Sequence, residues 1–282
     1  MKVKADCAPC LLNRALSALN KSDVSESAKI EAMIYITRSL ADRFNERAVP
    51  AFLEKDDMEF IKRYTGCPDP YAEVKKRASE IAKGVAQKID LEQVSWSEEH
   101  LHRLMELAVA ANGLEFDVQG YEFDPSSLER YQPLAIDDVH EMWSELLRAK
   151  TIAYVLDNVG EHIFDLIVAR YLSSHVEVHV YAKDNPLLND VTKVELLPDL
   201  SAGLKAYFYS PKAVGITWDD FEGSYDLVIA KGMANYETLT EDKPKFPVYH
   251  ALKVKCRPMA LSLGVPLLSG VVKRRSDPQE KT

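Results

Sequence analysis

The second half of the chain alternates between apolar runs and helical patterns. Two runs rich in β-branched residues, "TIAYVL" at 151–156 and "VEVHVYA" at 176–182, flank a helical pattern, "EHIFDLIVARYL". Two further apolar runs, "YDLVIA" at 225–230 and "MALSLGV" at 259–265, are also predicted to be strands. Strands that are apolar on both faces and are connected by helices are typical of a parallel sheet covered by helices. This half therefore predicts an α/β domain at residues 149–282.

The first half has helical patterns instead. The segment at 23–44 offers Asp23 as an N-cap, followed three residues later by Glu26. The segment at 69–89 begins with Asp-Pro, and the one at 97–113 ends with Asn-Gly, which are typical helix start and stop signals. These patterns predict a helical domain at residues 1–148, placed where it can cover an active site.

Composition and charge narrow the class of partner. The chain of 282 residues carries 35 basic and 44 acidic side chains, a net charge of −9 without a concentrated basic run. This argues against nucleic acid, and the short "KRR" at 273–275 is expected in a solvated tail. No apolar run reaches the ~18 residues of a membrane span, and the first residues lack the apolar core of a signal peptide. We expect a cytoplasmic protein without a membrane partner, whose oligomeric state the sequence does not predict.

Polar side chains follow the first two predicted strands. Asp157 and Asn158 come directly after the first strand, and Asn189 and Asp190 follow the second. Ligands of parallel sheets bind at the carboxyl ends of the strands, so these groups are candidates for one site. Carboxylate and amide oxygens suit Mg²⁺ or Mn²⁺. The alternative is that each acid caps the helix that follows it.

The third predicted strand ends in "AKGMANYE". Lys231 stands at its end, Gly232 permits a tight turn, and Asn235 and Tyr236 follow. A lysine beside turn amides is a reasonable phosphate-binding arrangement, although a surface lysine is the alternative. Walker A and GxGxxG patterns are missing from the sequence.

The four cysteines allow several interpretations. Cys7 and Cys10 form a C-x-x-C pair, Cys67 lies in a turn sequence, and Cys256 precedes the last predicted strand. A second C-x-x-C at zinc-finger spacing is missing, so three interpretations stay open. Cys7, Cys10 and Cys256 form a second metal site, or they include a redox pair, or they are buried small residues.

The N-terminal C-x-x-C is followed along the chain by four motifs. In order, they are "LDNVGEHIFD", "PLLNDVT", "DLVIAKGMANYE" and "KCRPMA". Together they resemble the metal-dependent damage-control phosphatases, also known as domain of unknown function 89, in the prokaryotic branch that carries these cysteines. The resemblance covers essentially the whole chain. It implies a Rossmann-like α/β/α sandwich beside a helical domain, and a divalent ion (Mg, Mn, Co or Ni).

The same resemblance implies roles for individual residues. Metal ligands would be Asp157, Asn158 and Asp190, and Glu161 would be the acid of the first motif. The phosphate-side motif would be Lys231, Gly232 and Asn235. The resemblance makes Asn112 a contact to the substrate, whereas Glu115 stands where the family has an aspartate. Independently of the resemblance, contacts to the substrate are also expected from Lys183, Asn189 and Tyr236. The implied activity is hydrolysis of phosphomonoesters of damaged or surplus metabolites, such as sugar phosphates.

Two other functions compete with this one. The first is an S-adenosylmethionine-dependent carboxyl methyltransferase, although the turn after the first strand, "DNVGE", holds a single glycine. The second is a metal- or redox-binding module built on Cys7, Cys10 and Cys256. It predicts stoichiometric metal that is lost when the C-x-x-C cysteines are replaced.

Overall fold

The computed structural model describes residues 1–88, 95–114 and 133–275 of the chain. Among these residues, seven strands form one sheet in the order β1-β7-β6-β5-β2-β3-β4. Neighbouring strands are parallel except β6 and β7, which are antiparallel. The predicted α/β class with a largely parallel sheet is therefore confirmed. The strands are β1 (Leu134–Asp137), β2 (Thr151–Val155), β3 (Glu177–Lys183), β4 (Lys205–Tyr209), β5 (Leu227–Lys231), β6 (Val248–Lys253) and β7 (Gly270–Arg275).

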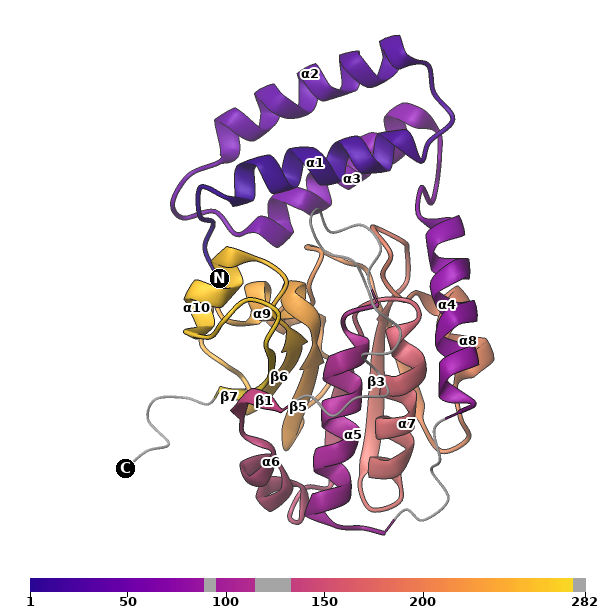
Figure 1. The fold of residues 1–282 in the computed structure, drawn as a ribbon, viewed down its shortest axis with the longest axis vertical. Coiled ribbons are helices and arrows are strands. Elements are labelled where there is room, and N and C mark those ends of the chain that lie inside the picture. The colour runs from indigo at the N-terminus through magenta and orange to yellow at the C-terminus, as the bar shows by residue number, and fades with distance from the viewer. Residues whose placement is uncertain (89–94, 115–132, 276–282) are drawn as a thin grey trace.

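Helices cover the sheet and extend beyond one end of it (Figure 1). In this view α5 and α7 lie in front of the sheet, and α1, α2 and α3 form a separate layer at the top. That layer shares a core with the loops that follow β3 and β4. The helices are α1 (Cys7–Asn20), α2 (Glu26–Arg43), α3 (Pro50–Thr65), α4 (Ala72–Ala86), α5 (Glu98–Ala111), α6 (Val139–Leu146), α7 (Glu161–Ser173), α8 (Lys193–Asp199), α9 (Gly232–Leu239) and α10 (Arg257–Leu263).

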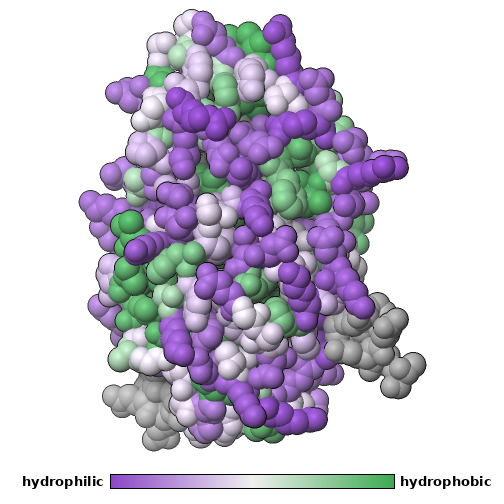
Figure 2. All heavy atoms as spheres, turned by 180° about the vertical axis from the view of Figure 1, so that it is seen from behind, coloured by the Kyte–Doolittle hydropathy of each residue, from purple (hydrophilic) through white to green (hydrophobic). Residues whose placement is uncertain are grey.

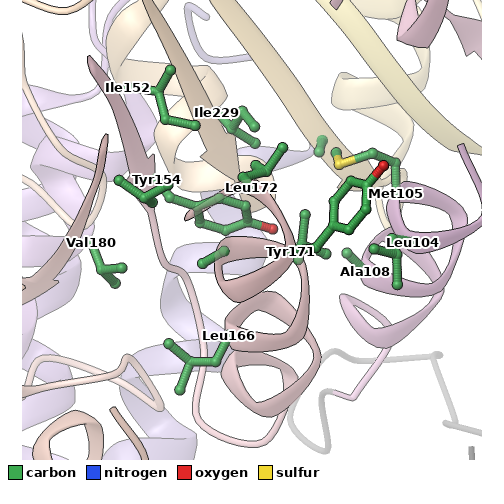
Figure 3. Close-up of a cluster of buried hydrophobic side chains, with 14 of the residues drawn as sticks. Leu104, Met105, Ala108, Ile152, Tyr154, Leu166, Tyr171, Leu172, Val180 and Ile229 are labelled. Atoms are coloured by element: carbon green, nitrogen blue, oxygen red, sulfur yellow. The ribbon is translucent and has the colours of Figure 1, made fainter. Parts of the chain in front are cut away.

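Alternate residues of the central strands enter two different cores. Ile152 and Tyr154 of β2 pack against α5 and α7, together with Ile229 of β5 (Figure 3). Ala153 and Val155 of β2 belong to a second core on the opposite face. Because successive strand residues point to opposite faces, strands buried on both sides must be apolar throughout. This explains the continuous apolar runs of the sequence.

The strand order places a switch point beside β2. The chain proceeds from β2 to β3 and β4 on one side, and then returns to β5 on the other side of β2. β2 is parallel to both β3 and β5, so the carboxyl ends of these three strands lie at one edge of the sheet. Ligands of open α/β sheets bind at such an edge.

One predicted strand is wrong. The run at 259–265 does not join the sheet, because Arg257–Leu263 forms α10. Pro258 stands in the first turn of this helix, and Gly264 ends it in the left-handed conformation with φ 71°. Short apolar runs fit a buried helix as well as a strand, and here the proline and the glycine mark helix ends.

The helical predictions for the first half place α2, α4 and α5 correctly, with two differences. Ser25, and not Asp23, caps α2, since its side chain accepts a hydrogen bond from the backbone N–H of Ala28. β1 interrupts the predicted helical region and pairs with β7. The division into domains at residues 1–148 and 149–282 stays a prediction.

The surface shows two further features. The "KRR" at 273–275 lies in β7 and not in a tail, and the Nε of Arg274 bonds Oε1 of Glu145 at 2.6 Å. Seen from behind, the surface is mostly hydrophilic, with hydrophobic residues in separate spots (Figure 2). No helix in the described part of the chain is long and apolar enough to cross a membrane.

Candidate functional site

A cavity of about 690 Å³ lies where α1 and α3 face the carboxyl ends of the strands. We call the side formed by the sheet edge the sheet-side wall; it consists of Asp157, Asn158, Asn189, Asp190 and Lys255. We call the opposite side, formed by α1 and α3, the helix-side wall; it consists of Cys7, Cys10, Asn13, Arg14, Ser17, Asn20 and Glu54.

Backbone hydrogen bonds bring the two acid-bearing segments together. Asn158 and Asp190 form an isolated antiparallel bridge. The N–H of Val159 donates to the carbonyl of Asn189 at 2.9 Å, and the N–H of Val191 donates to the carbonyl of Asp157 at 3.0 Å. The residues that follow β2 and β3 are thus paired with each other, which places both acids in one cavity wall.

Neither acid caps a helix. The N-cap of α7 is Gly160, without a side-chain cap. The N-cap of α8 is Thr192, whose side chain forms a capping box with Glu195. Helix capping therefore does not explain Asp157 or Asp190.

Gly232 makes room for the Asp157 carboxylate. Its φ is +77°, in the left-handed region that favours glycine. A Cβ on this residue would lie 1.7 Å from Oδ2 of Asp157, far inside contact distance. The side chain of Asp157, which follows β2, therefore requires a glycine at position 232, directly after β5.

Negative charge is concentrated in the sheet-side wall. Burial is the main reason why the pKa of Asp157 is raised, and the neighbouring Glu161 and Asp190 add to the increase, while Lys255 and Lys183 oppose it. Asp190 is also buried; its Oδ1 pairs with Nζ of Lys183 at 2.7 Å. Several buried carboxyl groups gathered at one place form an environment that favours a bound cation.

The donor atoms of this wall fit a divalent metal ion. The amide N–H of Asn158 donates to Oδ2 of Asp157 at 3.0 Å. The Oδ1 of Asn158 is a hard oxygen ligand, as are the two carboxylates. Within the described residues, no group of three or more His, Cys, Asp or Glu side chains is arranged to hold a metal. The set would therefore consist of two acids and an amide, with water or substrate oxygens as the remaining ligands.

Several predicted contact residues lie behind the cavity surface instead of lining it. Lys231 is fully buried and donates to Asp165, Glu161 and the carbonyl of Ala108. Lys183 lies behind Asp190, and Asn112 is fully buried. In this structure their contacts support the wall, and the roles expected of them from the sequence stay predictions.

Two residues that follow β5 also lie away from the cavity. The Oδ1 of Asn235 accepts a hydrogen bond from the N–H of Ile216 at 2.7 Å, and its Nδ2 donates to the carbonyl of Lys231. The hydroxyl of Tyr236 bonds Ser262 at 3.1 Å. Asn235 thus holds the turn after β5, and Tyr236 joins α9 to α10. Glu115 lies outside the described residues.

Lys255 is a cavity residue that the sequence analysis missed. It follows β6 in the "KCRPMA" motif, and its Nζ donates to the carbonyl of Asn112 at 2.9 Å. It is buried and lines the cavity beside Asp157, whose pKa it lowers. The signal in the sequence was a lysine that follows an apolar run and directly precedes Cys256.

Three cysteines meet at this cavity. Cys7 and Cys10 begin α1, Cys256 precedes α10, and all three are free thiols that line it. An ion pair between Arg257 and Asp6, at 3.2 Å, joins the two segments. Burial is the main reason why the pKa of the Cys7 thiol and that of the Cys256 thiol are raised. A second metal site or a redox pair here stays a prediction.

Comparisons with known proteins give a matching family model, several relatives and a similar solved structure. A family model described as the damage-control phosphatase ARMT1-like domain matches residues 3–220 and 216–269. A damage-control phosphatase from Pyrococcus horikoshii is 30% identical over 288 residues, covering 94% of this chain and 96% of the relative. One from Archaeoglobus fulgidus is 27% identical over 286 residues, with the same coverage of 94% and 96%. The crystal structure of a DUF89 family protein from P. horikoshii has a TM-score of 0.85 at 29% identity, covering 97% of this chain and 99% of that chain.

Proposed function

The chain belongs to the family of damage-control phosphatases with the ARMT1-like domain, and from this membership we propose that it is a metal-dependent phosphatase. Its substrates are phosphomonoesters of small, damaged or surplus metabolites. One observation carries the proposal: two buried acids and an amide share a cavity wall with a lysine.

The sheet-side wall supplies the groups that phosphate-ester hydrolysis needs. Asp157, Asn158 and Asp190 would hold the divalent ion, which is Mg, Mn, Co or Ni. When bound, the ion neutralises phosphate oxygens and acts as a Lewis acid. The ammonium of Lys255 binds a phosphate oxygen and offsets its negative charge. Phosphoryl transfer depends mainly on positioning and charge neutralisation, and both are built into this wall.

The helix-side wall supports a small polar substrate. Asn13, Ser17 and Asn20 place amide and hydroxyl groups along α1, and Arg14 is held by Oε1 of Glu54 at 3.1 Å. Groups of this kind hydrogen-bond to hydroxyls. The cavity of about 690 Å³ lies within the range of small-molecule sites. Sugar phosphates combine hydroxyls with one phosphate ester, and we propose them as the preferred class.

The test is phosphate release by the purified protein. With p-nitrophenyl phosphate and a set of phosphorylated metabolites, we expect turnover that a chelator abolishes and that Mn²⁺ or Co²⁺ restores. Asp190→Ala removes a ligand and should lower kcat/KM by at least 10³-fold. Asp219→Ala, an exposed acid bonded to Lys245, is the matched control and should leave the rate unchanged. Full turnover by Asp190→Ala contradicts the assignment.

A further inference from the structure

A line of buried polar contacts runs from the cavity wall into the interface between α7 and the sheet. Glu161 and Asp165 lie one turn apart on α7, and both are fully buried. Nζ of Lys231, at the end of β5, lies 2.7 Å from Oδ1 of Asp165 and 3.4 Å from Oε1 of Glu161. Its third contact is the carbonyl of Ala108 at 2.9 Å. An ammonium has three donors, so these contacts saturate Lys231 and keep it from the substrate.

The cavity end of this line passes through Asn112. Its Nδ2 donates to Oε2 of Glu161 at 2.7 Å and to Oδ2 of Asp157 at 3.2 Å. Its Oδ1 accepts from the N–H of Lys253 at 3.0 Å, and its carbonyl accepts from Lys255. Asn112 therefore joins Glu161 to Asp157 through its side-chain amide and holds Lys255 through its backbone carbonyl.

The inner end of the line is Asp165. Its Oδ1 accepts a second hydrogen bond, from the hydroxyl of Tyr154 at 2.9 Å. Its Oδ2 has no hydrogen-bond partner within the described residues. Burying a charged pair with an oxygen left over is costly, and an apolar pair would fill this space at lower cost. The stability of the fold does not account for Asp165 and Lys231.

We propose that Asp165 and Lys231 are positioning residues for the metal-binding wall. The pair fixes the carboxylate of Glu161, Glu161 fixes the amide of Asn112, and Asn112 fixes Asp157 and Lys255. In Asp165→Asn, Lys231 loses its nearest carboxylate and is drawn towards Glu161. There it competes with Asn112, which shifts together with Asp157. The inference rests on the proposed function in one respect: it takes Asp157 to be a metal ligand.

The test is Mn²⁺ binding to metal-free protein, measured by calorimetry without a substrate. Partners of metal ligands typically contribute 10–100-fold to metal affinity, so Asp165→Asn should weaken binding by at least about tenfold. The matched control is Asp57→Asn, because Asp57 is also buried and pairs with a cation, Arg43, at 2.7 Å. The control should bind Mn²⁺ like the parent protein. Equal affinities of Asp165→Asn and the control overturn the proposal.

A milder variant covers the case in which Asp165→Asn does not fold. Tyr154→Phe removes one hydrogen bond to Asp165 and should weaken Mn²⁺ binding about two- to threefold. Its control is Tyr181→Phe, since Tyr181 is a buried strand tyrosine in the core on the other face of the sheet. Unchanged affinity in Tyr154→Phe overturns the proposal.

Phosphate release from the same samples separates this proposal from the proposed function. If the parent binds Mn²⁺, loses affinity in Asp165→Asn and hydrolyses no ester, the proposed function fails and the positioning role stands. If the parent binds none of Mg²⁺, Mn²⁺, Co²⁺ and Ni²⁺, both fail.

Discussion

The two walls of the cavity differ in how their side chains are held. On the sheet-side wall, Asp157, Asp190 and Lys255 are buried, and the partners that bind them, Asn112 and Lys183, are buried as well. On the helix-side wall, Cys7 and Glu54 are also buried, but Cys10, Asn13 and Asn20 are exposed. Under the proposed function, this difference leads us to infer that catalysis and substrate choice have separate structural supports. The groups that must keep their geometry are anchored in the sheet, whereas α1 presents groups that a different substrate can rearrange.

The largest expected effect among further variants is at Lys255. Lys255→Met removes the ammonium of the sheet-side wall and should lower kcat/KM about 10²-fold, the loss typical of one group that stabilises transition-state charge. Steady-state kinetics measures this effect. Lys75→Met, which removes a buried lysine bonded to Asp69 and Glu195, is the control. If both variants lose the same activity, Lys255 has no special role in the wall.

Gly232→Ala tests the geometry of the same wall without changing its charge. The new Cβ displaces the Asp157 carboxylate, and a misplacement of about 1 Å costs about 10²-fold in rate. The control is Gly66→Ala, because Gly66 has a similar φ of +70° and open space around it. Gly66→Ala introduces a similar backbone strain without a steric clash, so it separates the two effects. An active Gly232→Ala protein would mean that Asp157 tolerates displacement.

Glu237 also lines the cavity, and its pKa predicts a pH-dependent stability. Burial, with a contribution from Glu54, raises this pKa from 4.5 to about 8. The folded protein therefore holds the proton more tightly than the unfolded chain. The resulting stabilisation is complete below pH 4.5 and is lost as the pH rises through 8.

Glu237→Gln stays neutral at every pH and so does not lose this stabilisation. Its advantage over the parent at pH 8.5 should be on the order of 1 kcal/mol, because water screens a half-buried group. At pH 5 the two proteins should unfold alike in urea. A constant difference between them across this range would refute the assigned pKa.

The smallest effect is expected from the thiols of the helix-side wall. In the double variant Cys7→Ser/Cys10→Ser the sheet-side wall is untouched, so kcat/KM should stay within about threefold of the parent, with the same Mn²⁺ requirement. Elemental analysis of both freshly purified proteins accompanies the kinetics. Stoichiometric zinc or iron in the parent alone, together with lost activity, would give the thiols a role equal to that of the acids.

The sequence was sufficient to predict the site residues that directly follow strands. Asp157, Asn158 and Asp190 follow strands, and the carboxyl ends of parallel strands meet at one edge, so their convergence could be inferred. The family resemblance, read from four motifs, is confirmed by the family model and the relatives. β1, β4, β6 and β7 were not predicted, and α10 was predicted as a strand.

The direction of the Lys231 side chain could not be predicted from the sequence. Leu227 and Ile229 face the core beneath α5 and α7, and Lys231 continues that alternation, so it points into the same interface. The alternation was visible in the sequence, but the face covered by α7 was not. Lys255 was missed for a related reason, since its place beside Asp157 depends on where β6 lies in the sheet.

The most direct test of the metal-dependent site is anomalous diffraction from crystals grown with Mn²⁺. We predict one strong peak in the sheet-side wall, within bonding distance of oxygens of Asp157, Asn158 and Asp190. A peak among Cys7, Cys10 and Cys256 with none at the acids would contradict this account.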